Sequence, residues 1–226
     1  MPSLKMKIKE YNGKFEGVPS DEDGRLIYLL NKLKFKQSEF EFLDKIYKQF
    51  KKQKTETYRF ILYLNPEPSP RPRVGRANRF YVRGAKENND LFFEILSSLE
   101  PLPIIITATE VKLVSYLPMP SAMNRYERFF AELGYIKPLS VPDWDNLAKT
   151  YTDMVQKGLI LNDSLIWKGE SIKFYSVKPR IDLSITYTKS YDCTYNRKHV
   201  EKSQFYLAED KERFDSSLRT VLSLNK

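Results

Sequence analysis

The order of strand-like and helix-like segments between residues 58 and 188 constrains the fold of this chain most. Tyr58–Leu64 has the composition of a strand and ends at a proline-rich stretch, and residues 103–117 predict one long strand or two short ones. Helices follow at about 121–133 and 146–157, each ending at a glycine, and then strands at 164–167, 172–177 and 181–187. Strands before and after helices predict an α+β fold, with a mixed β-sheet and flanking helices.

The two ends of the chain do not continue this pattern. Residues 1–57 predict an N-terminal helical hairpin, with helices at about 21–33 and 38–50. Residues 189–226 are polar up to Phe205, and Phe214, Leu218 and Val221 then recur on one face of a C-terminal helix, which we expect to dock on the core or on a partner chain. The sequence therefore predicts three parts, at 1–57, 58–188 and 189–226.

The scarcity of histidine and cysteine excludes several kinds of active site. With one His and one Cys, the chain cannot assemble a zinc site of the usual type, and a Ser-His-Asp mechanism would depend on His199, whose polar surroundings indicate a surface residue. Enzyme chemistry is left to carboxylates, lysines and a hard cation held by oxygens. No apolar run is long enough to span a membrane, and Cys193 cannot form an internal disulfide, so we expect a soluble, cytoplasmic protein.

An acidic segment around Pro142 is the strongest candidate for catalysis. It contains Asp143 and Asp145, with Lys149 one helical turn after Asp145. The proline favours extended backbone before it, so we expect both carboxylates on one side of an extended segment, with Asp145 or Asn146 as the helix N-cap. Two acids and an ammonium near a helix start suit a divalent cation beside a phosphate. The same residues also fit a plain helix cap with an i, i+4 charge pair.

A third carboxylate would complete such a metal site, and Asp163 is the candidate. The predicted helix ends near Gly158, and Asn162 and Asp163 form a turn into the next strand. Asp163 comes back to the start of the helix only if that strand runs alongside it. A surface turn without a catalytic role is the alternative interpretation.

A basic segment at residues 71–86 is the candidate for nucleic-acid binding. It has no acidic residue and includes Phe80 and Tyr81 among its cations, and arginine forms forked contacts with phosphate. The net charge of +9 is consistent with a polyanionic partner. Lys173 and Lys178, near the ends of later strands, are weaker candidates for the same role. The six cations of the segment are Arg71, Arg73, Arg76, Arg79, Arg83 and Lys86.

These features together resemble the RusA-type Holliday junction resolvases. The resemblance covers residues 58–187 and centres on Pro-Asp-x-Asp-Asn-Leu-x-Lys from Pro142 to Lys149. It implies that Asp143, Asp145 and Asp163 bind Mg²⁺, with Mn²⁺ as a substitute, and that Lys149 is needed for cleavage. It also implies a homodimer that cuts four-way DNA junctions symmetrically, in a bacterial or phage setting.

Two departures from the family pattern keep other functions open. The family usually has Asp at position 162, where this chain has Asn, and the spacing from the helix to this turn is about one residue short. The alternatives are a nuclease for flaps, forks or other branched DNA, a DNA-binding protein without activity, and an RNA-binding protein that stacks bases on Phe80 and Tyr81.

Overall fold

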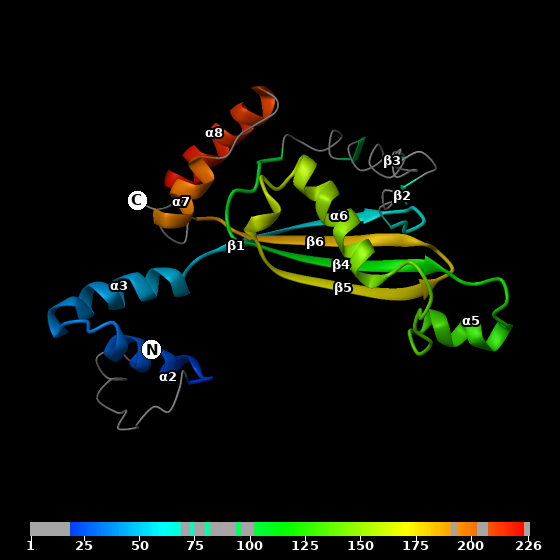
Figure 1. Ribbon diagram of the computed structural model, residues 1–226, viewed down its shortest axis with the longest axis horizontal. Coiled ribbons are helices and arrows are strands. Elements are labelled where there is room, and N and C mark those ends of the chain that lie inside the picture. Colours follow the sequence, from blue (N-terminus) through cyan, green and yellow to red (C-terminus); the bar gives the residue numbers. More distant parts are fainter. Residues whose placement is uncertain are drawn as a thin grey trace. The chain divides into compact units, whose positions relative to one another are not determined.

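Figure 1 shows a computed structural model of the chain, which describes residues 19–68, 73–74, 80–81, 94–95, 102–190, 194–202 and 208–223. The chain divides into two compact units, Met1–Gln53 and Lys54–Lys226. The predicted division into three parts at 57 and 188 stays a prediction. Among the described residues, no helix is both long and apolar enough to cross a membrane.

The first unit contains the predicted helical hairpin. The Asp21 side chain caps its first helix by accepting a 2.6 Å hydrogen bond from the N–H of Gly24. Glu22 then joins the two long helices, because its Oε1 accepts from the Tyr47 hydroxyl at 2.9 Å and pairs with the Lys51 ammonium at 2.6 Å. The elements are α2 (Glu22–Lys32), the 3-10 helix η1 (Gln37–Glu39) and α3 (Phe40–Lys51).

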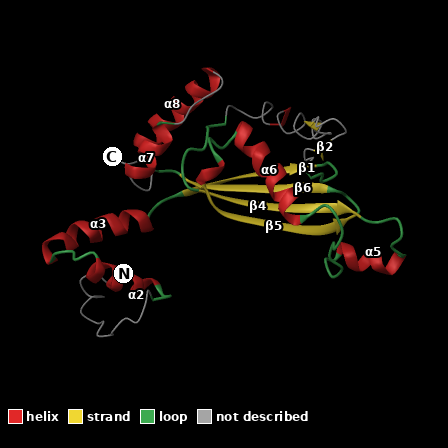
Figure 2. Ribbon diagram, in the orientation of Figure 1, coloured by secondary structure: helices red, strands yellow, loops and turns green. Residues whose placement is uncertain are grey.

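The second unit is built on a four-stranded mixed sheet with the order β1-β6-β4-β5. The edge strand β5 pairs parallel with β4, whereas β6 pairs antiparallel with both β4 and β1. Figure 2 shows this sheet with helices beside it, which confirms the predicted α+β fold. The strands are β1 (Thr55–Leu62), β4 (Thr109–Pro118), β5 (Ile166–Ser176) and β6 (Arg180–Thr188).

Two strand predictions are corrected by the structure. The predicted strand at 103–117 begins only at Thr109, and before it Ile105 forms a single bridge with Ile160. The predicted strands at 164–167 and 172–177 are one strand, β5, preceded by the 3-10 helix η2 (Asp163–Leu165). The sequence did not predict the middle of β5 as strand, because its residues are exposed and mostly polar. Ion pairs with β4 take the place of apolar contacts there. These pairs are Lys168–Glu110 and Lys112–Glu170.

Helix α6 (Trp144–Gly158) covers one face of the sheet (Figure 1). Its buried residues recur at helical spacing, and Leu147, Tyr151, Met154 and Val155 join the core cluster formed with the sheet. Burying an apolar side chain of this size contributes about 1.5–3 kcal/mol, so these residues fix the helix on the sheet. Because β4 and β5 are parallel, the chain between them must run back along the sheet, and α6 makes that return.

The C-terminal part of the second unit packs on the rest of that unit through a smaller apolar cluster. It consists of α7 (Thr194–Glu201) and α8 (Ala208–Ser223), and α8 was predicted. Helix α7 was not predicted, because Val200 is its one buried apolar residue among polar neighbours. Phe214 and Val221 of α8 are buried with Val200 against Ile104 and Ile106.

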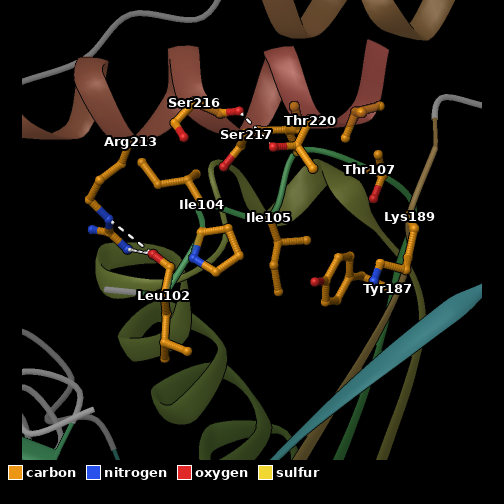
Figure 3. A pocket seen from close by; sticks show the side chains of 13 residues that line it. Leu102, Ile104, Ile105, Thr107, Tyr187, Lys189, Arg213, Ser216, Ser217 and Thr220 are labelled. Atoms are coloured by element: carbon orange, nitrogen blue, oxygen red, sulfur yellow. Dashed lines mark hydrogen bonds between the residues drawn. The ribbon is translucent and has the colours of Figure 1, made fainter. Parts of the chain in front are cut away.

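A pocket of about 260 Å³ remains under α8, and Arg213 lies at its edge (Figure 3). The Arg213 guanidinium donates to the carbonyl of Leu102 at 3.1 and 3.3 Å and to the carbonyl of Gly158 at 3.0 Å. This side chain therefore connects α8 to the C-terminal end of α6.

Candidate active site

The acidic segment lies at the N-terminal end of α6, in a different arrangement from the one predicted. The helix begins at Trp144, so the N-cap is Asp143 and not Asp145 or Asn146. Asp145 already lies in the first turn, and the two carboxylates are therefore not arranged by the alternation of an extended strand. The Asp143 side chain accepts no capping hydrogen bond from the helix backbone; its Oδ2 accepts from the Asn146 side chain at 3.3 Å.

Strand β5 holds the acidic segment on both sides of its first aspartate. The Trp144 indole Nε1–H donates to the carbonyl of Ser171 at 2.6 Å. The Lys173 ammonium donates to the carbonyls of Pro142 at 3.0 Å and Ser140 at 3.3 Å. Ser171 and Lys173 are two residues apart on one strand, so their side chains project from the same face of the sheet. The N-terminal end of α6 is thereby fixed to the sheet independently of the hydrophobic core.

Asp145 and Lys149 lie on the exposed face of α6, one helical turn apart. Asp143 is exposed as well, at the N-terminal end of the same helix. The N-terminal end of a helix carries unsatisfied N–H groups and partial positive charge, which favour a phosphate. The structure therefore brings two carboxylates and an ammonium to a surface that suits an anionic substrate.

Asp163 begins η2, directly before β5. Its neighbour Asn162 is the N-cap of this turn and accepts a 2.8 Å hydrogen bond from the N–H of Ser164, so the residue that departs from the family pattern has a structural role. Asp163 lines a pocket of about 300 Å³ between α6 and the sheet, together with Trp144 and Ala148. It is thus associated with the same helix as the acidic segment.

The structure does not bring all three carboxylates into one cluster. Helix α6 has 15 residues and is about 22 Å long, with Asp143 at its start and Asp163 five residues beyond its end. Among the described residues, no group of three or more His, Cys, Asp or Glu side chains is arranged to hold a metal ion. Mg²⁺ is nevertheless bound by oxygen donors, and proteins often hold this ion with only one or two carboxylates together with substrate phosphate and water. The donor set at the start of α6 fits this ion, and the sharing of one metal by Asp143, Asp145 and Asp163 stays a prediction.

Most of the predicted DNA-binding segment lies outside the described residues. Its described backbone forms a two-stranded antiparallel sheet, in which Arg73 pairs with Tyr81 and Val74 with Phe80. The strands are β2 (Arg73–Val74) and β3 (Phe80–Tyr81). The residues of the prediction that fall outside are Arg71, Arg76, Arg79, Arg83 and Lys86.

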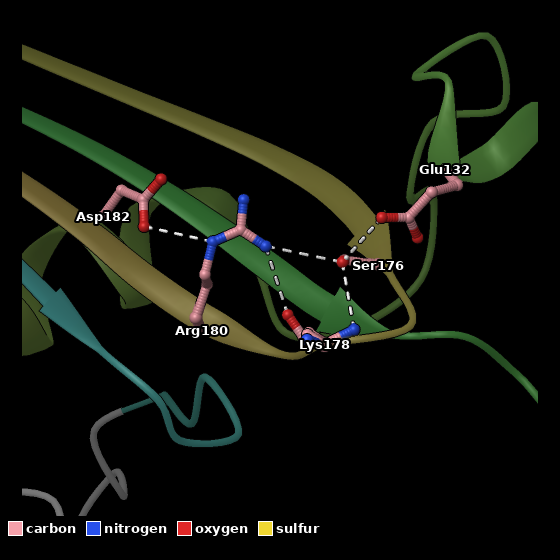
Figure 4. A network of polar contacts seen from close by, with 5 residues as sticks. All are labelled: Glu132, Ser176, Lys178, Arg180 and Asp182. Carbon is pink, nitrogen blue, oxygen red and sulfur yellow. Dashed lines mark hydrogen bonds and ion pairs between the residues drawn. The ribbon is translucent and has the colours of Figure 1, made fainter.

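The other two predicted DNA contacts differ in their surroundings. The Lys173 ammonium is bonded to backbone carbonyls, whereas Lys178 is exposed in the turn between β5 and β6. Glu132 holds this turn, because its carboxylate accepts from the Ser176 hydroxyl at 3.0 Å and from the N–H of Val177 at 2.7 Å (Figure 4). The sequence predicted no role for Trp144 or Glu132, and for Lys173 it predicted a DNA contact and not these bonds to the backbone. The sequence carried no local signal for them, since each contact joins residues at least 27 positions apart.

Comparison with known proteins identifies the family. The model of the family described as "Endodeoxyribonuclease RusA" matches residues 64–186, which contain the acidic segment, α6, η2, β5 and most of β6. The chain belongs to the RusA endodeoxyribonuclease family. The resemblance in the sequence is thereby confirmed, and the fold described above is that of a DNA-cleaving hydrolase.

One relative matches slightly more than half of the chain. The Bacillus subtilis (strain 168) protein described as "Uncharacterized protein YqaN" is 27% identical over 135 residues, which make up 56% of this chain and 94% of the relative. The RusA match begins after the first unit and ends before α7 and α8, so these parts lie outside it.

Proposed function

We propose that this RusA-family protein is a magnesium-dependent endonuclease that resolves four-way DNA junctions by symmetric hydrolysis of two phosphodiester bonds. The observation that supports the proposal best is the arrangement at the start of α6. There, Asp143, Asp145 and Lys149 are exposed together on a segment that β5 holds in place.

Each residue has a separate role in the proposal. Asp143 and Asp145 would hold Mg²⁺ together with substrate phosphate and water, and Mn²⁺ would substitute. A third ligand from Asp163 is what the family resemblance implies. When bound, the ion would polarise the scissile phosphate and lower the pKa of the attacking water. Lys149 would offset the charge that develops on the phosphate, and the helix N–H groups would orient it. The basic segment 71–86 would bind the DNA backbone.

The test is the cleavage of a four-way junction by the Asp145→Asn variant in Mg²⁺. This change keeps the size of the side chain and removes the charge that holds the metal. We expect cleavage to fall by at least a hundredfold while the junction is still bound. Chelation with EDTA should abolish cleavage by the unmodified protein, and Mg²⁺ should restore it. Undiminished cleavage by Asp145→Asn would refute the assignment of the site.

Two further functions are separated by related assays. A nuclease for flaps or forks would cut those substrates faster than the junction. A DNA-binding protein without activity is favoured by the lack of a three-carboxylate cluster among the described residues. Such a protein would bind the junction and show no strand breakage at any Mg²⁺ concentration.

A further inference from the structure

Helix α5 (Arg125–Glu132) carries aromatic side chains on its exposed surface. Tyr126 and Phe129 lie one turn apart and are 71% and 61% exposed. Phe130 and Tyr135 are exposed beside them. Exposed rings gathered on one element mark an interaction surface. We call Tyr126, Phe129, Phe130 and Tyr135 the aromatic surface.

The aromatic surface is held in a fixed arrangement. The rings of Phe129 and Phe130 meet edge to face at 5.4 Å, and those of Phe130 and Tyr135 at 6.2 Å. Helix α5 is itself capped, because Asn124 and Glu127 exchange hydrogen bonds of 3.0 and 2.7 Å. The rings therefore lose little conformational freedom when a partner covers them.

The chain between α5 and α6 runs back along β5 and connects the aromatic surface to the acidic segment. Glu132 accepts hydrogen bonds from the β5–β6 turn (Figure 4). The Lys137 ammonium then lies 4.5 Å from the centre of the Phe174 ring, and Trp144 is bonded to Ser171. Phe174 and Ser171 are three residues apart on β5, which corresponds to about 10 Å. Because successive nucleotides of a DNA strand are about 3.4 Å apart, the surface begins within about three or four nucleotides of the acidic segment.

Exposed apolar side chains continue from α5 to the acidic segment. Leu139 and Val141 are 95% and 80% exposed, and the Trp144 side chain at the start of α6 is exposed as well. A nucleotide combines a flat apolar base with a charged phosphate. An apolar surface that leads directly to carboxylates and a lysine suited to a phosphate therefore fits the bases of the same nucleic acid.

The charge around the aromatic surface is positive. Residues 121–140 and 176–182, which include α5 and the β5–β6 turn, contain five cations and three acids, a net charge of +2. Each acid is already engaged within the fold, in the cap of α5, on the β5–β6 turn or in an ion pair with Arg180 (Figure 4). A positive surface with exposed rings favours a polyanion that has flat groups. The acids are Glu127, Glu132 and Asp182, and the cations are Arg125, Arg128, Lys137, Lys178 and Arg180.

One of these cations lies over a ring of the aromatic surface itself. The Arg125 guanidinium is 5.7 Å from the centre of the Tyr126 ring. Proteins that bind single-stranded nucleic acids use the same two components, because bases stack on aromatic rings and cations bind the adjacent phosphates. The pair of Arg125 and Tyr126 supplies both components at one position.

We infer that the aromatic surface binds unpaired bases of the branched substrate, which stack on Tyr126, Phe129 and Tyr135. The inference deepens the proposed function and rests on it for the identity of the substrate. Bases inside a continuous duplex have their faces covered by their neighbours, so only nucleotides that are opened at a branch or lie in a single strand offer the faces that this surface needs. The surface would therefore distinguish branched or single-stranded DNA from continuous duplex.

The experiment measures dissociation constants of the full chain by fluorescence anisotropy in EDTA, so that no DNA is cut. The probes are an oligothymidine of about 12 nucleotides, a continuous duplex and a four-way junction. The double variant Phe129→Leu/Tyr135→Leu removes two rings and keeps an apolar surface. We expect it to raise the Kd for oligothymidine and for the junction by at least about fivefold and to leave the Kd for the duplex unchanged.

The matched control is the double variant Phe42→Leu/Tyr195→Leu. It removes a phenylalanine from α3 and a tyrosine from α7 that are 66% and 81% exposed, and it should bind all three probes as the unmodified protein does. Circular dichroism checks the folding of both double variants. Tyr126→Leu alone tests the same contact if the double variant in the aromatic surface does not fold.

The inference would be overturned by an unmodified protein that does not bind oligothymidine, by a folded variant in the aromatic surface that binds it with unchanged Kd, or by an equal loss of affinity for the duplex. A variant with an altered mass in solution and unchanged DNA affinity would identify the surface as a contact between protein chains. The nuclease proposal fails separately, because Asp145→Asn should lose cleavage and still bind oligothymidine.

Discussion

Lys173 offers a sharp test of whether β5 positions the acidic segment. Its ammonium donates to the carbonyls of Pro142 and Ser140, directly before Asp143. We predict that Lys173→Met lowers kcat for junction cleavage and leaves KM unchanged, because the side chain acts through the segment and not on the DNA. A charged hydrogen bond contributes about 1.5–3 kcal/mol when buried, but one of these two bonds is exposed and the other is partly buried. We therefore expect the activation free energy of cleavage to rise by about 1–2 kcal/mol, which corresponds to a decrease of about 5- to 30-fold in kcat.

The control is Lys178→Met, which removes the same charge from an exposed lysine in the next turn. If Lys178 contacts DNA phosphate, this variant should raise KM, reduce the salt dependence of binding and leave kcat unchanged. Lys173→Arg, which keeps the charge and the donors, should recover part of the lost kcat. The reasoning would be refuted if Lys173→Met behaved like Lys178→Met, or if it cleaved the junction at the normal rate.

Two other predictions concern stability. Arg213→Met removes three hydrogen bonds that a charged donor makes to the carbonyls of Leu102 and Gly158. We expect α8 to loosen and the free energy of unfolding, measured in urea, to fall by about 2 kcal/mol. An unchanged unfolding midpoint would contradict this role. The hydrogen bond from Lys189 holds the pKa of the Glu56 carboxyl below its ordinary value. A lowered pKa stabilises the fold above the ordinary pKa of a glutamate, and this contribution is lost as the pH falls through the folded-state value. The stability difference between the unmodified protein and Glu56→Gln should therefore be present at pH 7 and decrease as the pH falls below the ordinary pKa of a glutamate, in acid titrations followed by circular dichroism. A difference that keeps its full size at the acid end of the titration would exclude this pair as its source.

The sequence by itself determined most of the elements around the site, and it predicted the chemistry that is proposed for it. The spacing of Asp143, Asp145 and Lys149, and the apolar face of α6 that includes Leu147 and Met154, are local features that depend on residue order alone. The family match over 64–186 agrees with the interpretation of these motifs. The start of α6 was predicted two residues too late, because Asp145 and Asn146 are also good N-cap residues and the sequence does not choose among neighbouring caps.

Only the tertiary structure decided what surrounds the acidic segment. The contacts of Trp144 with Ser171 and of Lys173 with Pro142 join residues 27 and 31 positions apart. These contacts exist because β5 pairs parallel with β4, and α6, which lies between the two strands in the chain, returns across the sheet. The strand order cannot be predicted from the local periodicity of the sequence. For the same reason the sequence could propose Asp163 as a third ligand but could not place it, since its position depends on where η2 meets β5 after the helix has crossed the sheet.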